Sequence, residues 1–288
     1  MEKLNILYAS DKRGVNLMLI SAYSVMKHVD SDIDFYIMCS PLPKEETERI
    51  NKLLSRQNVT VNYVNVNPEI FKDYYCTKGL PVETLFRLTI GDMLPVEADR
   101  VLYIDIDVLC VSSDIKNLYQ TNFDGCGIIA VNDAGIGDSY TKSLIGDNVN
   151  GYFNAGVLLI DLDYWRKNNL FEKIDSLMKM NAYKAADQDC LNIIFKDKWK
   201  AVSARFNYMS PQVFKDMMFY HRKGVIKGFN PVLIHYDGPH KPWFSICANP
   251  YKDLYYECER ELDVYAQRRR YVNFSMIYQY IKYRFLSL

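Results

Sequence analysis

Short apolar runs alternate with longer amphipathic segments along most of the chain. Runs rich in β-branched and aliphatic residues predict strands at LNILYA (4–9), IDFYIMC (33–39), VTVNYVNV (59–66), RVLYIDI (100–106), CGIIAVN (126–132) and GVLLIDL (156–162). Segments 15–29 and 44–56 have helical apolar spacing. Strand, helix, strand in this order predicts an α/β fold, with a Rossmann-like, mostly parallel sheet and helices on both faces.

Two aspartates interrupt the fourth of these runs, 103-YIDIDVLC-110. If the strand continues through them, Asp105 and Asp107 point to one face, and Ile104, Ile106 and Val108 point to the other. Paired carboxylates in apolar surroundings are costly unless a cation lies between them. We therefore interpret the pair as a divalent-cation site at the carboxyl end of a strand, in the ligand crevice of an open sheet. The alternative is two turn residues that cap the segment 111–119.

Composition excludes several classes of protein. The 288 residues are 49% hydrophobic, which suits one large domain or a main domain with a small appendage. Thirty-five basic residues balance thirty-five acidic ones, so nucleic acid is not expected as a partner. The start lacks a secretory signal and no later uncharged apolar run could span a bilayer, so we expect a cytoplasmic protein. Seven cysteines without a C-x-x-C pair are interpreted as reduced core residues, not zinc ligands.

Three further motifs follow YIDIDVL in the chain: 152-YFNAGVLLIDLDYW-165, 187-DQDCLN-192 and 234-IHYDGPHKPW-243. In this order, from the first strand to about residue 245, the chain resembles the family 8 retaining glycosyltransferases. The branch it resembles is that of the bacterial lipooligosaccharide and lipopolysaccharide α-galactosyltransferases. The resemblance implies a GT-A fold and transfer of galactose or glucose from a UDP-sugar to a hydroxyl of a glycan or glycolipid acceptor, in lipopolysaccharide or surface polysaccharide biosynthesis. It also implies a catalytic domain at 1–250, with a nucleotide-sugar part at 1–132 and an acceptor part at 133–250.

The resemblance makes His235 the third metal ligand beside Asp105 and Asp107. Two carboxylates and an imidazole suit Mn²⁺, with Mg²⁺ as a substitute, and a divalent cation would stabilise the diphosphate leaving group. The UDP contacts implied by the family are Ala9, Asp11, Arg13, Arg87, Asp105, Ile106, Gly238 and Lys241. Arg13 departs from the small polar residue usual in the galactosyltransferase branch, and without the resemblance Arg87 would be read as a surface ion-pair residue on a helix. No role is assigned to His240.

Sugar and acceptor contacts implied by the family are Asp133, Asn154, Asp187 and Gln188. Gln188 falls at the position facing the anomeric carbon, and an amide is a poor nucleophile, which favours same-face substitution over double displacement. Asp189 is kept as a second catalytic candidate, a reserve nucleophile. It could equally cap the helix that it begins. Tyr74, Tyr75 and Lys78 lie in a segment that could contact the acceptor.

Two other functions compete. The pattern YIDIDV also fits haloacid-dehalogenase-type phosphatases, but there it begins the first strand, whereas here three strands precede it, and 146-GDNVNG-151 has one acid where a pair is expected. A catalytically inactive sugar-binding module is the second alternative, although the whole proposed metal set is retained.

The segment 251–288 is predicted to be a helical, basic and aromatic tail. Residues 265–288 contain no acid. An aromatic face and a cationic set would suit a helix that attaches the protein peripherally to an anionic membrane surface, on the inner face. The aromatic face is Tyr271, Phe274, Tyr278, Ile281 and Phe285, and the cations are Arg268, Arg269, Arg270, Lys282 and Arg284. The alternative is that this face packs on the catalytic domain.

Overall fold

The structure is a computed structural model that describes residues 3–75, 81–147, 151–222, 230–270, 277, 278 and 280–282. Its main sheet has seven strands in the order β3-β2-β1-β4-β7-β6-β8. These strands are β1 (Leu4–Ala9), β2 (Ile33–Cys39), β3 (Val59–Asn65), β4 (Arg100–Ile104), β6 (Ile128–Ala130), β7 (Val157–Asp161) and β8 (Trp199–Ala201). Only β7 runs antiparallel to its neighbours β4 and β6, so the predicted mostly parallel sheet is confirmed.

A smaller sheet of three strands continues the fold above the main sheet. It contains β5 (Val108–Cys110), β9 (Tyr208–Met209) and β10 (Leu233–His235). Strand β10 pairs antiparallel with β5 and parallel with β9. This sheet brings a segment from late in the chain against the residues that directly follow β4.

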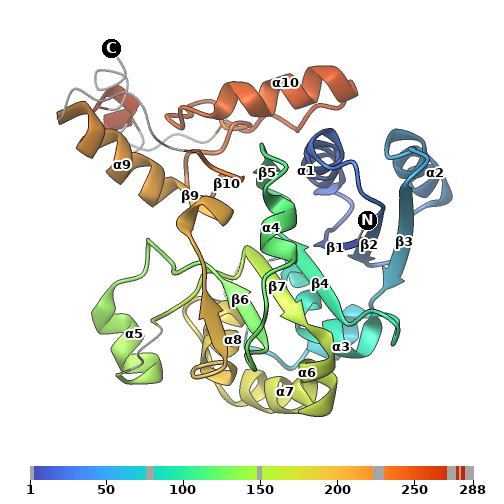
Figure 1. The fold of residues 1–288 in the computed structure, drawn as a ribbon, viewed down its shortest axis with the longest axis vertical. Coiled ribbons are helices and arrows are strands. Elements are labelled where there is room, and N and C mark those ends of the chain that lie inside the picture. The colour runs from blue at the N-terminus through green and yellow to red at the C-terminus, as the bar shows by residue number, and fades with distance from the viewer. Residues whose placement is uncertain are drawn as a thin grey trace.

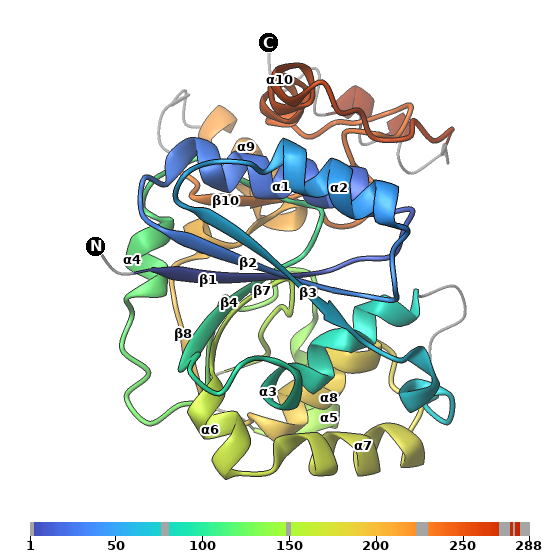
Figure 2. The same cartoon turned by 90° about the vertical axis from the view of Figure 1, so that its right-hand side faces the viewer.

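Helices cover both faces of the main sheet, as predicted (Figure 1, Figure 2). On one face lie α1 (Val15–His28) and α2 (Lys44–Leu53), with α10 (Lys252–Leu262) packed outside α1. On the other face lie the 3-10 helix η2 (Val82–Thr89), α3 (Ile90–Met93), α6 (Leu162–Lys167), α7 (Leu170–Met180) and α8 (Ala186–Ile194). The remaining helices are η1 (Pro68–Phe71), α4 (Ile115–Tyr119), α5 (Asp138–Ile145), η3 (Ala204–Phe206) and α9 (Ser210–Arg222).

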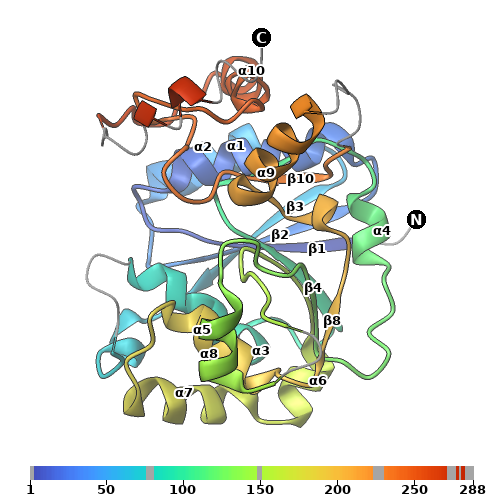
Figure 3. The same ribbon diagram turned by 90° about the vertical axis from the view of Figure 1, so that its left-hand side faces the viewer.

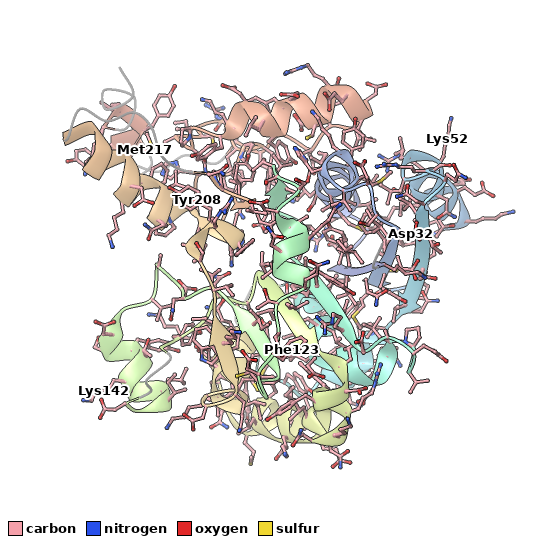
Figure 4. The ribbon with its side chains drawn as sticks, in the orientation of Figure 1. Asp32, Lys52, Phe123, Lys142, Tyr208 and Met217 are labelled. Atoms are coloured by element: carbon pink, nitrogen blue, oxygen red, sulfur yellow. The ribbon has the colours of Figure 1, made fainter. Side chains whose placement is uncertain are left out.

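Strand β1 shows how the sequence builds two cores from one sheet. Ile6 and Tyr8 join the core under α1, whereas Leu7 between them joins the core under η2 and α8. Successive side chains of a strand point to opposite faces, so a run that is apolar throughout is buried on both sides. Side chains fill the space between the layers, while Lys142 on α5 lies at the edge of the molecule (Figure 4).

The sequence after β10 shares the core under α1. Tyr255, Cys258 and Leu262 of α10 are buried in it, and so are Val264 and Ala266 of the extended segment that follows. Figure 3 shows this part of the chain above α1 and α2. The first part of the predicted tail is therefore packed against the sheet's helices.

Several predictions fall outside the described residues: Cys76, Lys78, Tyr271, Phe274, Arg284 and Phe285. Residues 277, 278 and 280–282 are helical, and Tyr278 and Ile281 are exposed. Cys39, Cys110, Cys190, Cys247 and Cys258 are buried free cysteines, and Cys126 is half-buried. None of the helices in the described ranges is long and apolar enough to cross a membrane.

Candidate active site

A cavity of about 710 Å³ opens where β1 and β4 end. Such a volume lies in the range of small-molecule sites. Four parts of the chain line it: the loop from β1 into α1, the helix η2, the residues that follow β4, and the amino end of α8. The segment Lys241–Phe244 and the distant residue Arg269 complete the lining.

The two aspartates lie in a turn and not in a strand. Strand β4 ends at Ile104, and Val108 N donates to Asp105 O (3.1 Å) across the turn that leads into β5. The predicted strand 100–106 is therefore too long. Ile106 packs on the core under α1 together with Ile104 and Val108, as expected, although it also lines the cavity with the two aspartates. The pair does lie directly after a buried strand, at its carboxyl end, as interpreted.

Strand register brings His235 to the aspartates. His235 pairs with Val108, and Tyr236 N donates to Asp107 O (3.0 Å). The side chains of Asp105, Asp107 and His235 each offer one ligand atom, and these atoms lie within 4.8 Å of one another. Two carboxylate oxygens and an imidazole nitrogen at this spacing fit a divalent transition metal such as Mn²⁺.

A hydrogen-bond chain fixes the orientation of the imidazole. Gly156 N donates to Asn154 Oδ1 (2.9 Å), so this atom is the oxygen of the amide. Asn207 Nδ2 donates to the same oxygen (2.8 Å), and the other end of the Asn207 amide, Oδ1, therefore faces His235 Nδ1 (2.9 Å). An acceptor at Nδ1 places a ring hydrogen on that nitrogen. Nε2 is left facing Asp107 Oδ1 at 3.3 Å.

Asn207 is fully buried and was missed by the sequence analysis. Its only local signal is a polar residue ahead of the apolar pair YM. Asn154 was expected to contact sugar or acceptor. The structure places Asn154 in the hydrogen-bond chain that orients His235, and its Nδ2 donates to Asp133 Oδ2 (3.0 Å). The side chain of Asn154 does not line the cavity.

The charges around Asp107 stabilise one another. Burial by itself would raise the pKa of Asp107, but Lys241 and His235 outweigh it and lower this pKa. Burial would lower the pKa of His235, but Asp107 outweighs it and raises this pKa to about 9. Lys241 Nζ donates to Asp107 Oδ2 and to Tyr236 O (2.9 Å). The ammonium of Lys241 thus lies beside the carboxylate that is a candidate metal ligand.

Arg87 is buried, not a surface residue, so the surface ion pair considered for it is wrong. It lies on η2 with 5% of its surface exposed. Its Nη1 donates to Asp105 Oδ1 (3.1 Å) and to Ala155 O (2.7 Å), and its Nε lies 2.7 Å from Asp187 Oδ2 as an ion pair. Tyr103 places its ring beneath the guanidinium, 4.7 Å from centroid to Cζ, and donates its hydroxyl to Asp105 Oδ1 (2.6 Å).

Gln188 is held at the cavity wall by partners that fix its amide. Its Oε1 accepts from Ala155 N (2.8 Å), and its Nε2 donates to Asp133 Oδ2 (3.0 Å). Gln188 and Asp187 line the cavity, whereas Asp133 lies behind Gln188 and is not part of the lining. Gln188 and Asp133 therefore form one hydrogen-bonded unit, and Gln188 lines the same cavity as Asp105 and Asp107.

Asp189 is fully buried and bound by three donors. Its carboxylate accepts from Tyr140 (2.5 Å), Tyr152 (2.6 Å) and the backbone N–H of Ala185 (2.8 Å) at the start of α8. It does not line the cavity. This environment favours the structural role considered for Asp189 over that of a nucleophile.

The residues expected to contact the nucleotide line one cavity, with one exception. Ala9, Asp11, Arg13, Arg87, Ile106 and Lys241 all line the cavity. Asp11 Oδ1 accepts from Gly14 N (2.7 Å), and its Oδ2 pairs with the exposed Arg13 (2.5 Å). Gly238 does not line the cavity. It has a φ of 66°, which only glycine adopts readily, so its role visible here is in the turn after β10.

Comparison with known proteins gives one consistent result. The sequence model of the family described as "Glycosyl transferase family 8" matches residues 5–247. The lipopolysaccharide 1,3-galactosyltransferase of Salmonella typhimurium is 29% identical over 90% of this chain and 78% of its own length. The lipopolysaccharide 1,2-glucosyltransferase of Escherichia coli is 29% identical over 86% of this chain and 75% of its own length. A crystal structure of the galactosyltransferase LgtC with donor and acceptor sugar analogues is 26% identical, with a TM-score of 0.78, and covers 96% of this chain and 100% of that one.

Proposed function

The chain belongs to glycosyl transferase family 8, and from this we propose that it is a retaining α-glycosyltransferase that uses UDP-galactose or UDP-glucose. The proposed acceptor is a hydroxyl of a glycan or glycolipid in lipopolysaccharide or surface polysaccharide biosynthesis. Relatives described as lipopolysaccharide galactosyl- and glucosyltransferases support both the donor pair and the acceptor class. The observation that carries the proposal is the cluster of Asp105, Asp107 and His235 beside a cavity of nucleotide-sugar size.

Asp105, Asp107 and His235 would hold Mn²⁺, for which Mg²⁺ could substitute. The cation would supply Lewis-acid stabilisation of the diphosphate as the bond to the sugar breaks. The chain prepares this site: Arg87 and Tyr103 hold Asp105, and Asn207 turns Nε2 of His235 toward Asp107. Lys241 forms an ion pair with Asp107, and its long side chain would turn to the diphosphate when the cation takes its place at Asp107.

The nucleotide is proposed to bind at the loop after β1, against Ala9, Asp11, Arg13 and Ile106. Arg87 and Lys241 are proposed to reach the diphosphate, and Gly238 to shape the turn that carries Lys241. Asp133, Asn154, Asp187 and Gln188 are proposed to bind or orient the sugar and the acceptor. The position of Asp187 and Gln188 on the cavity wall supports their part of this assignment.

Same-face substitution is the proposed mechanism. Gln188 presents an amide whose two ends are already hydrogen-bonded, and Asp189 is buried among tyrosines, so neither is well suited to attack the anomeric carbon. The chain would instead hold the donor and the acceptor in position and stabilise the charge that develops. The departing phosphate oxygen would then take the proton of the acceptor hydroxyl.

Cytoplasmic location, with peripheral attachment to the inner face of a membrane through 265–288, is also proposed. The aromatic and cationic composition of that segment supports it, as do the exposed Tyr278 and Ile281. The division into a catalytic part at 1–250 and a following tail at 251–288 is proposed only as a division of roles, which the end of the family match at residue 247 supports, because the first part of the tail shares the core of the catalytic part. The phosphatase and the inactive sugar-binding module have no such support.

UDP release from a panel of UDP-sugars, with and without Mn²⁺, tests the function. We expect release from UDP-galactose or UDP-glucose, lost on chelation. Asp105→Asn and Asp107→Asn should each lower the rate by at least ~100-fold, because a lost ligand removes several kcal/mol of leaving-group stabilisation. Asp99→Asn, an exposed aspartate at the other end of β4, is the matched control and should keep full activity. The proposal would be contradicted if none of the UDP-sugars released UDP, or if the two variants kept full activity in the presence of a chelator.

A further inference from the structure

Among the residues that the structure describes, Arg269 is the one that lines the cavity from outside the part of the chain that the family matches. The other described lining residues fall within 5–247. It belongs to the extended segment 264–270 that follows α10. From composition alone, Arg269 was grouped with the cations of a membrane-binding tail.

A buried carboxylate anchors this segment. Asp263 ends α10 in the left-handed region (φ 52°), and the chain reverses so that Val264 N donates to Glu259 O (3.1 Å). The side chain of Glu259 is 1% exposed and accepts from Ala266 N (2.9 Å) and from Arg268 Nη2 (2.5 Å). Side chains alternate along an extended segment, so Arg268 and Arg269 leave on opposite sides.

Backbone pairing then fixes Arg269 against the loop that carries Lys241. Arg269 N donates to Trp243 O (2.9 Å), and Ser245 N donates to Arg269 O (3.0 Å). At the start of the segment, Asn16 Nδ2 of α1 donates to Tyr265 O (2.8 Å). The segment is thus tied both to the helix that follows the β1 loop and to the residues beside Lys241.

Arg269 has no carboxylate partner among the residues that the structure describes. Most other charges of the cavity lining are paired: Arg13 with Asp11, Arg87 with Asp105 and Asp187, and Lys241 with Asp107. Within the described ranges Arg269 forms no ion pair, and the lining carboxylate Glu83 is not its partner.

A second lining cation, Lys184, also has no ion pair in the part of the chain that the structure describes. It lies over the ring of Tyr140, ahead of α8, on the side of the cavity proposed for the sugar. Of Lys184 and Arg269, Arg269 is the one whose backbone pairs with the loop that carries Lys241.

We propose that Arg269 donates hydrogen bonds from its guanidinium to the diphosphate of the donor, so that the segment after α10 completes the nucleotide site. A guanidinium matches phosphate oxygens with two parallel N–H groups, and the diphosphate is the part of a nucleotide sugar that carries concentrated negative charge. The inference rests on the proposed UDP-sugar donor. It gives this chain a diphosphate contact from outside the family-matched region.

Titrations of UDP and of uridine, each in the presence of Mn²⁺, test the contact. Arg269→Gln should raise the Kd for UDP about tenfold, the effect of losing one charge-assisted contact, and leave the Kd for uridine unchanged. Arg269→Lys should recover part of the loss, since it restores the charge without the planar fork. Arg270→Gln, at the equally exposed neighbour that does not line the cavity, is the matched control and should change neither Kd.

The outcomes separate this inference from the proposed function. An equal loss for UDP and uridine, or no change for UDP, would overturn the role of Arg269 while leaving the UDP-sugar donor in place. An unchanged Kd for UDP with a raised KM for an anionic acceptor would assign Arg269 to the acceptor and would also overturn the inference. Failure of the unaltered protein to bind UDP would instead overturn the donor proposal, and the inference with it. Thermal unfolding of each variant separates lost binding from lost folding.

Discussion

Arg87 joins the candidate metal ligands to the residues proposed for the sugar. Its buried guanidinium contacts Asp105 on one side and Asp187 on the other, at the wall of the cavity. A buried charge is tolerable only when it is paired, and one arginine shared between two carboxylates leaves one acid incompletely compensated. That acid is Asp187, because burial outweighs Arg87 and raises the pKa of Asp187 to about 6.

This raised pKa predicts how stability depends on pH. An unpaired aspartic acid has a pKa of 3.8, so between about pH 4 and 6 the folded protein keeps a proton on Asp187 that the unfolded chain has lost. The contribution of Asp187 to the free energy of unfolding therefore falls as pH rises through this window. Asp187→Asn removes that contribution. We expect the unfolding free energy of the variant, relative to the unaltered protein, to rise between pH 4.5 and pH 7 in chemical denaturation. A constant difference across this range would contradict the raised pKa.

Gln188 gives a second prediction at the scale of one side chain. Its amide bridges Ala155 and Asp133 at the cavity wall, next to the position proposed for the anomeric carbon. Gln188→Ala should lower kcat at least ~10-fold and change the Kd for UDP-sugar little, because stabilisation of developing charge acts in the transition state. Gln212→Ala, on α9 outside the cavity lining, is the control. Steady-state kinetics and calorimetry measure the two effects, and a parallel loss of affinity would make Gln188 a donor-binding residue.

At the scale of elements, the pattern of apolar residues predicted the strands and helices that depend on local sequence alone. The runs 4–9 and 33–39 and the helix starting at residue 15 match the structure because burial on both faces requires continuous apolar sequence. The strand ending at Ile104 was extended by two residues, since YIDI alone does not reveal a turn stabilised by its own backbone hydrogen bond. The place of Asp105 and Asp107 in an apolar run predicted a cation site, and motif resemblance added His235 to it.

The hydrogen bonds that hold these three residues in place could not be predicted from the sequence, because they depend on the register between distant strands. Pairing of β10 with β5 places His235 opposite Val108, and only then does Asn207 come within reach of the imidazole. Burial of Arg87 likewise depends on how η2 crosses the end of the sheet. The sequence of ETLFRLTIGDML has helical spacing, and nothing in it identifies which polar residue faces the core.

Gly156 directly precedes β7 and lies against His235 of β10. This close contact predicts a strict requirement for glycine at position 156. A Cβ at Gly156 would lie 2.3 Å from His235 Cε1, closer than van der Waals contact allows. Gly156→Ala should therefore displace the imidazole and lower Mn²⁺-dependent UDP release at least ~10-fold, with a loss of roughly 1–3 kcal/mol in stability. The control is Gly137→Ala, where an added Cβ meets nothing within 4 Å. Equal activity of the two variants would show that the imidazole position does not matter.

At the scale of the whole molecule, the sequence after residue 250 serves the main core and the cavity. Helix α10 packs on α1 and buries Tyr255, Cys258 and Leu262. The segment after it buries Val264 and Ala266 and brings Arg269 to the cavity. A catalytic unit ending at residue 250 would thus leave a large apolar surface of its own core exposed. Of the residues after 270, those that the structure describes (277, 278 and 280–282) do not line the cavity.

Two truncations separate these parts. A chain ending at residue 250 should lose on the order of 5 kcal/mol or more of its free energy of unfolding, because each large apolar side chain removed from the core contributes about 1.5–3 kcal/mol. Whole domains are stable by only about 5–15 kcal/mol, so this loss would be severe. A chain ending at residue 270 keeps α10, Glu259 and Arg269, so it should unfold within a few degrees of the full chain and bind UDP with unchanged Kd. If 271–288 binds membranes, only the full chain should co-sediment with anionic liposomes, and less so as salt rises, because counterions screen the attraction. Co-sedimentation of neither chain at low salt would contradict the membrane role, and normal stability of the chain ending at 250 would contradict the shared core.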